Sequence, residues 1–193
     1  MKILKLVLFI FISLSLNNIS FAKDPSSLIK DIVNEASLIL NSSDPVESKI
    51  IKLNDIAERN VDISGIGMYA LGKHKKLMSE DQKIKYKKLF KSYFLKSFSS
   101  RLVDYTDPKI NVISQKKIND NYTIVNTILK STTEVKIDWR IYTKNPDRPL
   151  IRDLIVEGLS LARTQKEEFA SVIESNNGDV KKLFITLKEF VNK

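Results

Sequence analysis

The residues that could perform chemistry in this 193-residue chain are few. Ser160 follows Gly158 in the run EGLS, where a nucleophilic serine could stand. Such a serine needs a base, and the single histidine, His74, lies on a remote, lysine-rich segment. The Gly-x-Ser-x-Gly motif of hydrolases is also absent from the sequence. The residues therefore argue against a serine hydrolase.

The acidic residues and the remaining motifs do not indicate a catalyst either. Asp153 and Glu157 flank a predicted strand end, and we interpret them as a hydrogen-bonding pair that supports local structure rather than as a general acid and base. With no cysteine and one histidine, thiolate chemistry, disulfides and multi-histidine metal sites are excluded. The run 65–67, Gly-Ile-Gly, lacks the third glycine of a dinucleotide-binding loop. We expect no enzyme activity, no metal and no cofactor.

The first 22 residues have the pattern of a secretory signal peptide. Lys2 and Lys5 precede an apolar run of about 11 residues, which is shorter than the ~20 needed to span a bilayer. A small-x-small cleavage site ends at Ala22. We expect residues 1–22 to be removed and residues 23–193 to form a single domain outside the cytoplasm.

The chain is basic, with a formal net charge of +9. Outside the cytoplasm, this charge favours anionic membrane surfaces or acidic partner proteins over nucleic acid. The lysine-rich predicted helix also lacks the aromatic residues on a sheet surface that single-strand nucleic-acid binders use. We expect a monomer that does not bind nucleic acid.

After the expected signal peptide, apolar residues recur at helical spacing. Asp24-Pro25 and Asp44-Pro45 are typical of helix starts, the second with Glu47 in a capping-box position. The segment 61–73 indicates a short helix whose glycines permit close approach of another segment, and Ser79 with Gln82 forms a second capping box. That box opens a long helix from Glu80 to about Val103, along which Phe90, Phe94 and Phe98 form one stripe.

From residue 110 on, apolar residues no longer recur at helical spacing but alternate with polar residues, which is a period of two. Strands are expected over 110–118, 122–130, 134–143 and 150–156. The third alternates cleanly, with Val135, Ile137, Trp139 and Ile141 on one face and charged residues on the other. The stretch 151–173 reads as a strand that turns at Gly158 directly into a helix, and a last helix follows Asp179. The order predicts an α+β fold with N-terminal helices, a four-stranded curved antiparallel sheet and C-terminal helices.

A concave sheet capped by helices is a natural container for an apolar ligand. The Phe90 stripe and the Trp139 face supply two opposed apolar walls, and the segment after Gly158 supplies a third. From the residues alone we therefore expect an enclosed apolar cavity and no visible catalyst.

Two segments resemble a known family. Asp62, Ala70-Leu71-Gly72-Lys73, Ser79-x-x-Gln82 and Phe90 form the first, and DLIVEGLSL at 153–161 followed by Phe169 forms the second. Together they are similar to the MlaC family, also called toluene-tolerance or ABC-transporter auxiliary proteins, over nearly the whole chain after the signal peptide. Departures from the family pattern include His74, where an aromatic residue is usual, and the lack of a tryptophan at 150–151.

The resemblance implies a periplasmic phospholipid carrier. Such a protein shuttles lipid between an outer-membrane lipoprotein complex and an inner-membrane ABC transporter with an MCE-domain subunit, and so maintains outer-membrane lipid asymmetry. The bound phospholipid is cargo, not a cofactor. The residues expected to line the cavity or its mouth are Met68, Leu71, Phe90, Phe94, Phe98, Val135, Ile137, Trp139, Ile141, Leu161 and Phe169.

Three lysines near the expected mouth, Lys73, Lys75 and Lys76, are candidate contacts for phosphate or for an acidic partner. Two other classes stay open at this point. One is a secreted isomerase or hydrolase on a similar cone-shaped scaffold, which would need a buried carboxylate inside the cavity. The other is an adaptor that joins membrane proteins through its basic surface.

Overall fold

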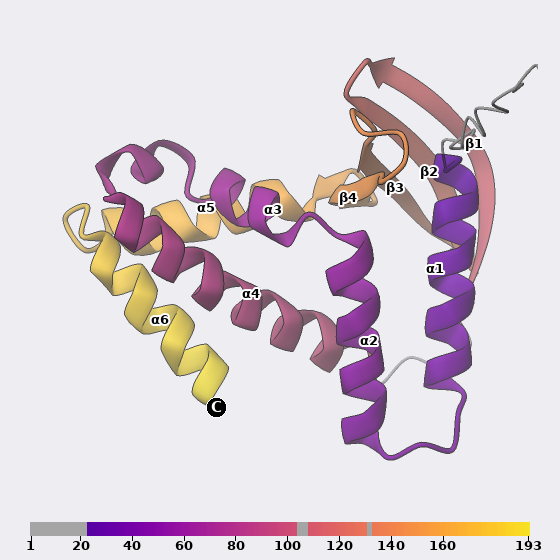
Figure 1. The fold of residues 1–193 in the computed structure, drawn as a ribbon, viewed down its shortest axis with the longest axis horizontal. Helices are drawn as coiled ribbons and strands as arrows, with labels where there is room; N and C mark the ends of the chain where they lie inside the picture. The colour runs from indigo at the N-terminus through magenta and orange to yellow at the C-terminus, as the bar shows by residue number, and fades with distance from the viewer. Residues whose placement is uncertain (1–22, 104–107, 131–132) are drawn as a thin grey trace, which may run out of the picture.

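The computed structural model describes residues 23–103, 108–130 and 133–193. In these ranges, helices come first, a sheet follows and helices close the chain, which confirms the predicted α+β fold (Figure 1). The predicted signal peptide, residues 1–22, and most of the predicted turn at 131–133 lie outside the described residues. Within the described ranges, no helix is both long enough and apolar enough to cross a membrane.

The helices are close to those expected. Their bounds are α1 Pro25–Leu40, α2 Val46–Asn60, α3 Ile63–Ala70, the 3-10 helix η1 Gly72–Leu77, α4 Glu80–Leu102, α5 Leu161–Glu174 and α6 Val180–Asn192. The predicted segment 61–73 is thus divided at Gly72, whose φ of 53° ends α3 and leads into η1.

The sheet is an antiparallel meander. Its strands are β1 Lys109–Asn119, β2 Tyr122–Lys130, β3 Val135–Tyr142, β4 Leu150–Val156 and β5 Leu159–Ser160, and they lie in sequence order. The four predicted strands are present, and the two-residue β5 is an addition. Val61 forms a further isolated parallel bridge with Ile151, so the chain before α3 lies along β4.

Three of the four predicted helix starts are confirmed, among them Asp179, whose side chain accepts from the Lys181 amide at 2.9 Å at the start of α6. The Asp24 carboxylate accepts from the Ser27 amide at 2.9 Å, and Ser79 with Gln82 forms a complete capping box at the start of α4. The capping box predicted for α2 is wrong. Because α2 begins one residue later than expected, Pro45 stands at its N-cap without a side-chain bond, and Asp44 pairs with Lys52 instead.

The junction before α5 also differs from the direct strand-to-helix turn that we expected. Glu157 and Gly158 both have positive φ, 48° and 84°, as the two central residues of a tight hairpin turn do. The chain therefore folds back as β5, which pairs with the end of β4, before α5 begins. Glu157 is held in this conformation because its amide donates to the Lys136 carbonyl and its carboxylate accepts from the Lys136 amide.

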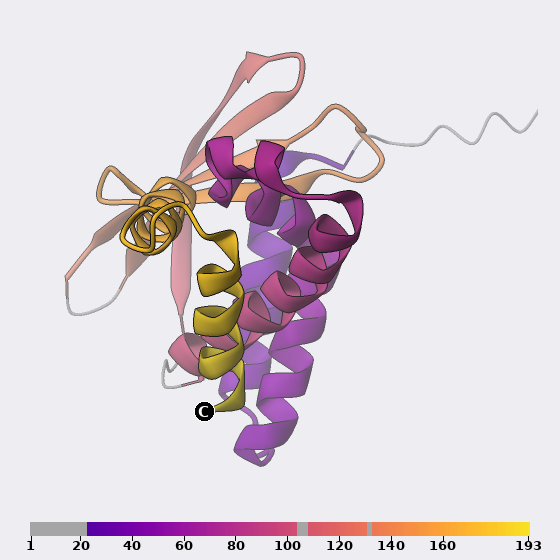
Figure 2. The same cartoon turned by 90° about the vertical axis from the view of Figure 1, so that its left-hand side faces the viewer.

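Buried apolar residues form two separate clusters. The larger, which we call the helical core, lies among η1 and α3 to α6, and Figure 2 shows α4 and α6 of this group side by side. Its buried members are Ile63, Ala70, Leu71, Met78, Tyr86, Phe90, Phe169, Ile173, Val180, Leu183 and Leu187. The smaller, which we call the sheet core, lies where α1 covers β1 and β2. Its buried members are Leu28, Ile29, Val125, Ile141 and Ile151.

Candidate functional site

Five of the predicted lining residues lie in or against the helical core. Leu71, Phe90 and Phe169 are almost fully buried in it, while Met68 and Phe94 are partly buried and pack against it. Phe90 meets Phe169 edge to face, with ring centroids 6.1 Å apart. The first turns of the aromatic stripe on α4 are therefore part of a closed core.

The stripe opens toward the C-terminal end of α4. Phe98 is only partly buried, and its ring stacks on Phe94 at a centroid distance of 6.0 Å and an interplanar angle of 9°. α4 packs chiefly against α2, α3 and α6, whereas the sheet packs chiefly against α1 and α5. The two apolar walls that the sequence predicted thus belong to different packing groups.

The predicted face of β3 is confirmed as one face of the strand. Val135, Ile137 and Trp139 are partly buried, and Ile141 is fully buried in the sheet core. Among these four residues, full burial is therefore confined to Ile141 near the end of the strand. Trp139 is the transition, because it packs against the sheet core but stays partly exposed.

Three further apolar residues share this face and were missed by the sequence reasoning. The strand register pairs Leu129 with Val135, Leu154 with Trp139, and Val156 with Ile137. We call the set the inner apolar face. Its members are Leu129, Val135, Ile137, Trp139, Leu154 and Val156, all partly buried. Alternation within the strands was visible in the sequence, but the pairing that joins them depends on where each hairpin turns.

The polar groups on this face are satisfied within the sheet. The Trp139 indole Nε1 donates to Thr127 Oγ1 at 2.9 Å, and that hydroxyl donates to the Ile137 carbonyl at 3.0 Å. The Trp139 indole and the Thr127 hydroxyl therefore both donate hydrogen bonds within the sheet, and the exposed part of this face is apolar. A partly exposed face of this kind is suited to a ligand without polar recognition.

Leu161 stands apart from the other predicted lining residues. It is 41% exposed at the first position of α5. Its place is fixed by Asp153, whose carboxylate accepts from Ser160 Oγ at 2.7 Å and from the Ala162 amide at 3.0 Å. The predicted pair of Asp153 with Glu157 is wrong, because the β4–β5 hairpin turns Glu157 toward Lys136 and brings Ser160 to Asp153.

The arrangement around Ser160 is structural. Ser160 is the N-cap of α5, and its Oγ accepts from the Arg163 amide at 3.1 Å while it donates to Asp153. His74 lies on η1, 3.8 Å from Glu174 at the opposite end of α5, about 20 Å of helix away. Serine and histidine are thus not brought together. In the described part of the chain, no group of three metal-ligating side chains is present.

The lysines at the predicted mouth have different surroundings. Lys73 forms an ion pair with Glu174 at 2.8 Å, which holds the pKa of that carboxyl below its ordinary value. Lys75 and Lys76 are exposed on η1. Their contact with phosphate or an acidic partner stays a prediction.

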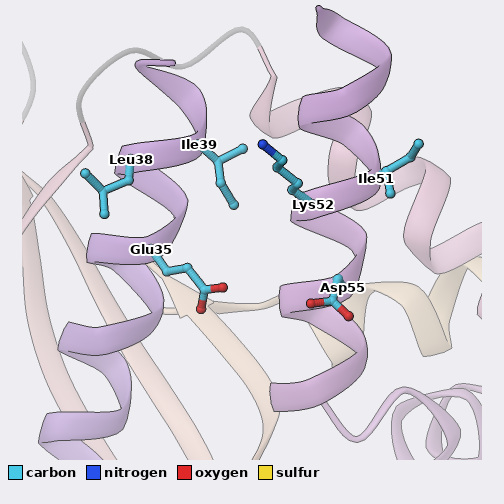
Figure 3. A pocket seen from close by; sticks show the side chains of 6 residues that line it. All are labelled: Glu35, Leu38, Ile39, Ile51, Lys52 and Asp55. Carbon is cyan, nitrogen blue, oxygen red and sulfur yellow. The ribbon is translucent and has the colours of Figure 1, made fainter. Parts of the chain in front are cut away.

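A hollow of about 480 Å³ lies between α1 and α2. Figure 3 shows Ile39 on α1 and Lys52 on α2 pointing toward one another across it. The full lining is Glu35, Leu38, Ile39, Ile51, Lys52 and Asp55. None of these is a predicted lining residue, and Arg59 already bridges its two carboxylates, at 2.6 Å and 2.9 Å.

The fold is shared with known proteins. No curated protein matches the chain. Among solved structures, the chain is similar to the phospholipid-binding protein from Ralstonia solanacearum, determined in complex with a phospholipid, with a TM-score of 0.73 and 21% identity over 88% of this chain and 97% of that one. At this identity the likeness establishes the shared fold. The family model described as MlaC protein matches residues 30–189, and the chain belongs to the MlaC family.

Proposed function

We propose that this protein binds a phospholipid with its acyl chains against the inner apolar face and carries it between membranes. The observation that supports this most directly is the partial burial of the whole face, from Leu129 to Val156, beside a sheet core that is fully packed. Each methylene transferred from water to such a surface contributes roughly 0.8 kcal/mol. Two acyl chains therefore need much apolar area and little polar recognition.

Membership of the MlaC family and the phospholipid in the Ralstonia solanacearum relative support the same ligand class. On this proposal Phe94 and Phe98 face the acyl chains from α4, and Trp139 and Ile137 face them from the sheet. The residues sealed in the two cores, such as Phe90 and Ile141, then act by holding the walls in place.

The finer proposal concerns place and partners. The protein works in the periplasm after removal of residues 1–22 and exchanges lipid with an outer-membrane lipoprotein complex and with an inner-membrane ABC transporter that has an MCE-domain subunit. It does so as a monomer and without catalysis. The positive net charge fits passage between anionic surfaces.

No observation favours the enzyme alternative. Among the described residues Asp153 is the only buried carboxylate, and both of its oxygens accept hydrogen bonds at the start of α5. A general base needs a free oxygen within reach of a substrate proton.

Native mass spectrometry of the protein purified from the periplasm of its host tests the proposal. The expected spectrum contains the protein with one non-covalently bound phospholipid. A delipidated sample should then take up lipid from phospholipid vesicles. An empty protein that takes up no lipid from vesicles contradicts the carrier function.

A further inference from the structure

A second pocket lies on the other face of the sheet. Its volume is about 400 Å³, at the lower end of the range for small-molecule sites. The lining residues are Gly65, Ile66, Tyr69, Ile118, Asn119, Tyr122, Ile124, Arg140, Arg152, Asp153 and Ala162. Ile124 and Arg140 form a cross-strand pair in this lining, whereas their neighbours Val125 and Trp139 belong to the sheet core and the inner apolar face. The pocket is thus separated from the proposed lipid wall by the sheet itself.

One of its two arginines is fixed in place. The Arg152 guanidinium lies 3.7 Å from the centre of the Tyr142 ring, donates through Nε to Asp62 at 2.6 Å and through Nη1 to the Tyr122 hydroxyl at 2.8 Å. A guanidinium has five N–H donors, and these bonds use two of them. The remaining donors are presented in a fixed orientation, which lowers the entropic cost of binding an anion.

The other arginine is less committed. Within the described residues, the charged contact of Arg140 is a 3.7 Å approach of Nη1 to Asp153 Oδ2, beyond hydrogen-bond distance. That carboxylate already accepts from Ser160 and Ala162. The Arg140 side chain is 45% exposed, so its guanidinium can reach a ligand in the pocket.

The local charge favours an anion. Both nearby carboxylates are occupied, Asp153 as described and Asp62 by the Gly65 amide at 2.8 Å and by Arg152. A third cation, Lys166, lies 5.4 Å above the Tyr69 ring that lines the pocket. The charged residues of the lining itself are Arg140, Arg152 and Asp153, so the lining carries a net positive charge.

The other side of the pocket is apolar and partly open. Ile118 is 50% exposed and Tyr69 is 47% exposed, although both line this pocket beside Ile66 and Ile124. Apolar area that stays exposed to water in the same pocket as two arginines is complementary to a ligand with an anionic head and a short apolar stem.

We infer that this pocket is a binding site for a phosphate-type oxyanion carried on a short apolar stem, with Arg140 and Arg152 on the oxyanion and Ile118 and Tyr69 on the stem. The site goes beyond the carrier function, because it lies on the opposite face of the sheet and its volume suits a small ligand rather than two acyl chains. The proposed ligand is therefore a phosphate ester, and the experiment distinguishes it from free phosphate.

The test is a titration of the full chain followed by NMR of the arginine Nε–Hε signals, with hexyl phosphate, inorganic phosphate and hexyltrimethylammonium as probes. Hexyl phosphate should shift the Arg140 and Arg152 signals and bind about tenfold more tightly than inorganic phosphate, because several stem methylenes leave water. Hexyltrimethylammonium should shift neither signal. Equal affinity for the ester and for free phosphate, or no shift with either, overturns the proposal.

Two matched pairs of variants localise the binding. Arg140→Gln should weaken hexyl phosphate about tenfold, as loss of a charge-assisted bond does, whereas Arg148→Gln, an exposed arginine outside the lining, should change it less than about twofold. Ile118→Ser should weaken hexyl phosphate but not inorganic phosphate, and Ile113→Ser, at a similarly exposed β1 position outside the lining, should weaken neither. If both variants of either pair lose the same affinity for hexyl phosphate, a specific site is contradicted.

The amount of co-purified phospholipid distinguishes this inference from the proposed function. Arg140→Gln should carry the wild-type amount of lipid. If it loses that lipid together with its response to hexyl phosphate, the pocket belongs to the lipid site and the inference of a separate site is wrong.

Discussion

The helical core and the inner apolar face are both apolar but differ in how far their side chains are buried. In the helical core, aromatic rings from α4 and α5 contact one another, and Phe90 is 1% exposed. On the sheet, the six residues of the inner apolar face stay partly exposed beside the fully buried sheet core. One region is thus closed by its own side chains, while the other leaves apolar area for something else to cover.

The difference has a structural basis in how the helices are placed. α1 covers β1 and β2, and α5 contacts β4, but the long helix α4 packs chiefly on other helices. Figure 1 shows α4 running from the α3–α6 group to α2. A carrier needs a stable frame next to an apolar surface that can bind and release a ligand. The helical core fits the first role and the inner apolar face fits the second.

The largest expected effect is in the helical core. Phe90→Ala should lower the free energy of unfolding by about 3–5 kcal/mol, because it removes a fully buried ring and leaves a cavity. On the inner apolar face, Ile137→Ala should cost about 1 kcal/mol in the lipid-free protein, since its side chain is already partly in water. Urea unfolding of both delipidated variants measures the contrast, and equal losses would remove the distinction between the two regions.

A smaller effect tests how tightly the helical core is packed. A Cβ added at Gly67 would lie 2.6 Å from Phe90 Cδ1, so Gly67→Ala should destabilise by about 1–3 kcal/mol through overpacking. Ser64→Ala, at an exposed position of the same helix, is the control and should change stability by about 0.5 kcal/mol or less. A neutral Gly67→Ala variant would show that α3 and α4 can separate easily.

The smallest of these effects concerns the cap of the helix that covers the sheet core. Asp24→Ala should cost about 1 kcal/mol at neutral pH, because the Ser27 amide loses its acceptor. The same hydrogen bond is the main cause that lowers the Asp24 pKa in the folded protein. This stabilisation is therefore present above the unfolded-state pKa and is lost as the pH falls through the folded-state pKa.

Unfolding of wild type and Asp24→Ala across acidic pH measures that dependence. The two curves should converge in acid, where the wild-type carboxylate is protonated. Asp31→Ala removes a nearby exposed carboxylate that pairs with Lys23 at 3.5 Å, and it should cost about 0.5 kcal/mol or less. A stability difference between wild type and Asp24→Ala that persists unchanged in acid would contradict the cap.

Much of the fold was readable from local patterns. The capping box at Ser79, the cap at Asp24 and the alternation along β3 each depend on residues within a few positions of one another, and each is confirmed. The close approach predicted for the glycines of α3 is confirmed at Gly67 by its contact with Phe90. The two wrong predictions, the α2 capping box and the Asp153–Glu157 pair, also have local causes. The first fails because α2 begins one residue later, with Pro45 at its N-cap, and the second fails because a tight turn at Glu157 directs its side chain away from Asp153.

The candidate site was harder to predict because it depends on long-range packing. Periodicity marked Phe90 and Phe98 as equivalent, yet one is sealed in the helical core and the other is partly open. Leu154 joins the inner apolar face only through its pairing with Trp139. The pocket with Arg140 and Arg152 required the β3–β4 register, which no single strand reveals.

The most direct test of the central claim is the phospholipid content of two neighbouring variants of β3. Ile137→Glu places a charge on the inner apolar face, and Lys136→Glu places the same charge on the exposed side of the same strand. After purification from the periplasm, native mass spectrometry should find Lys136→Glu with bound phospholipid at the wild-type level and Ile137→Glu folded but empty. An Ile137→Glu protein that keeps the wild-type amount of phospholipid would contradict the inner apolar face as the lipid site.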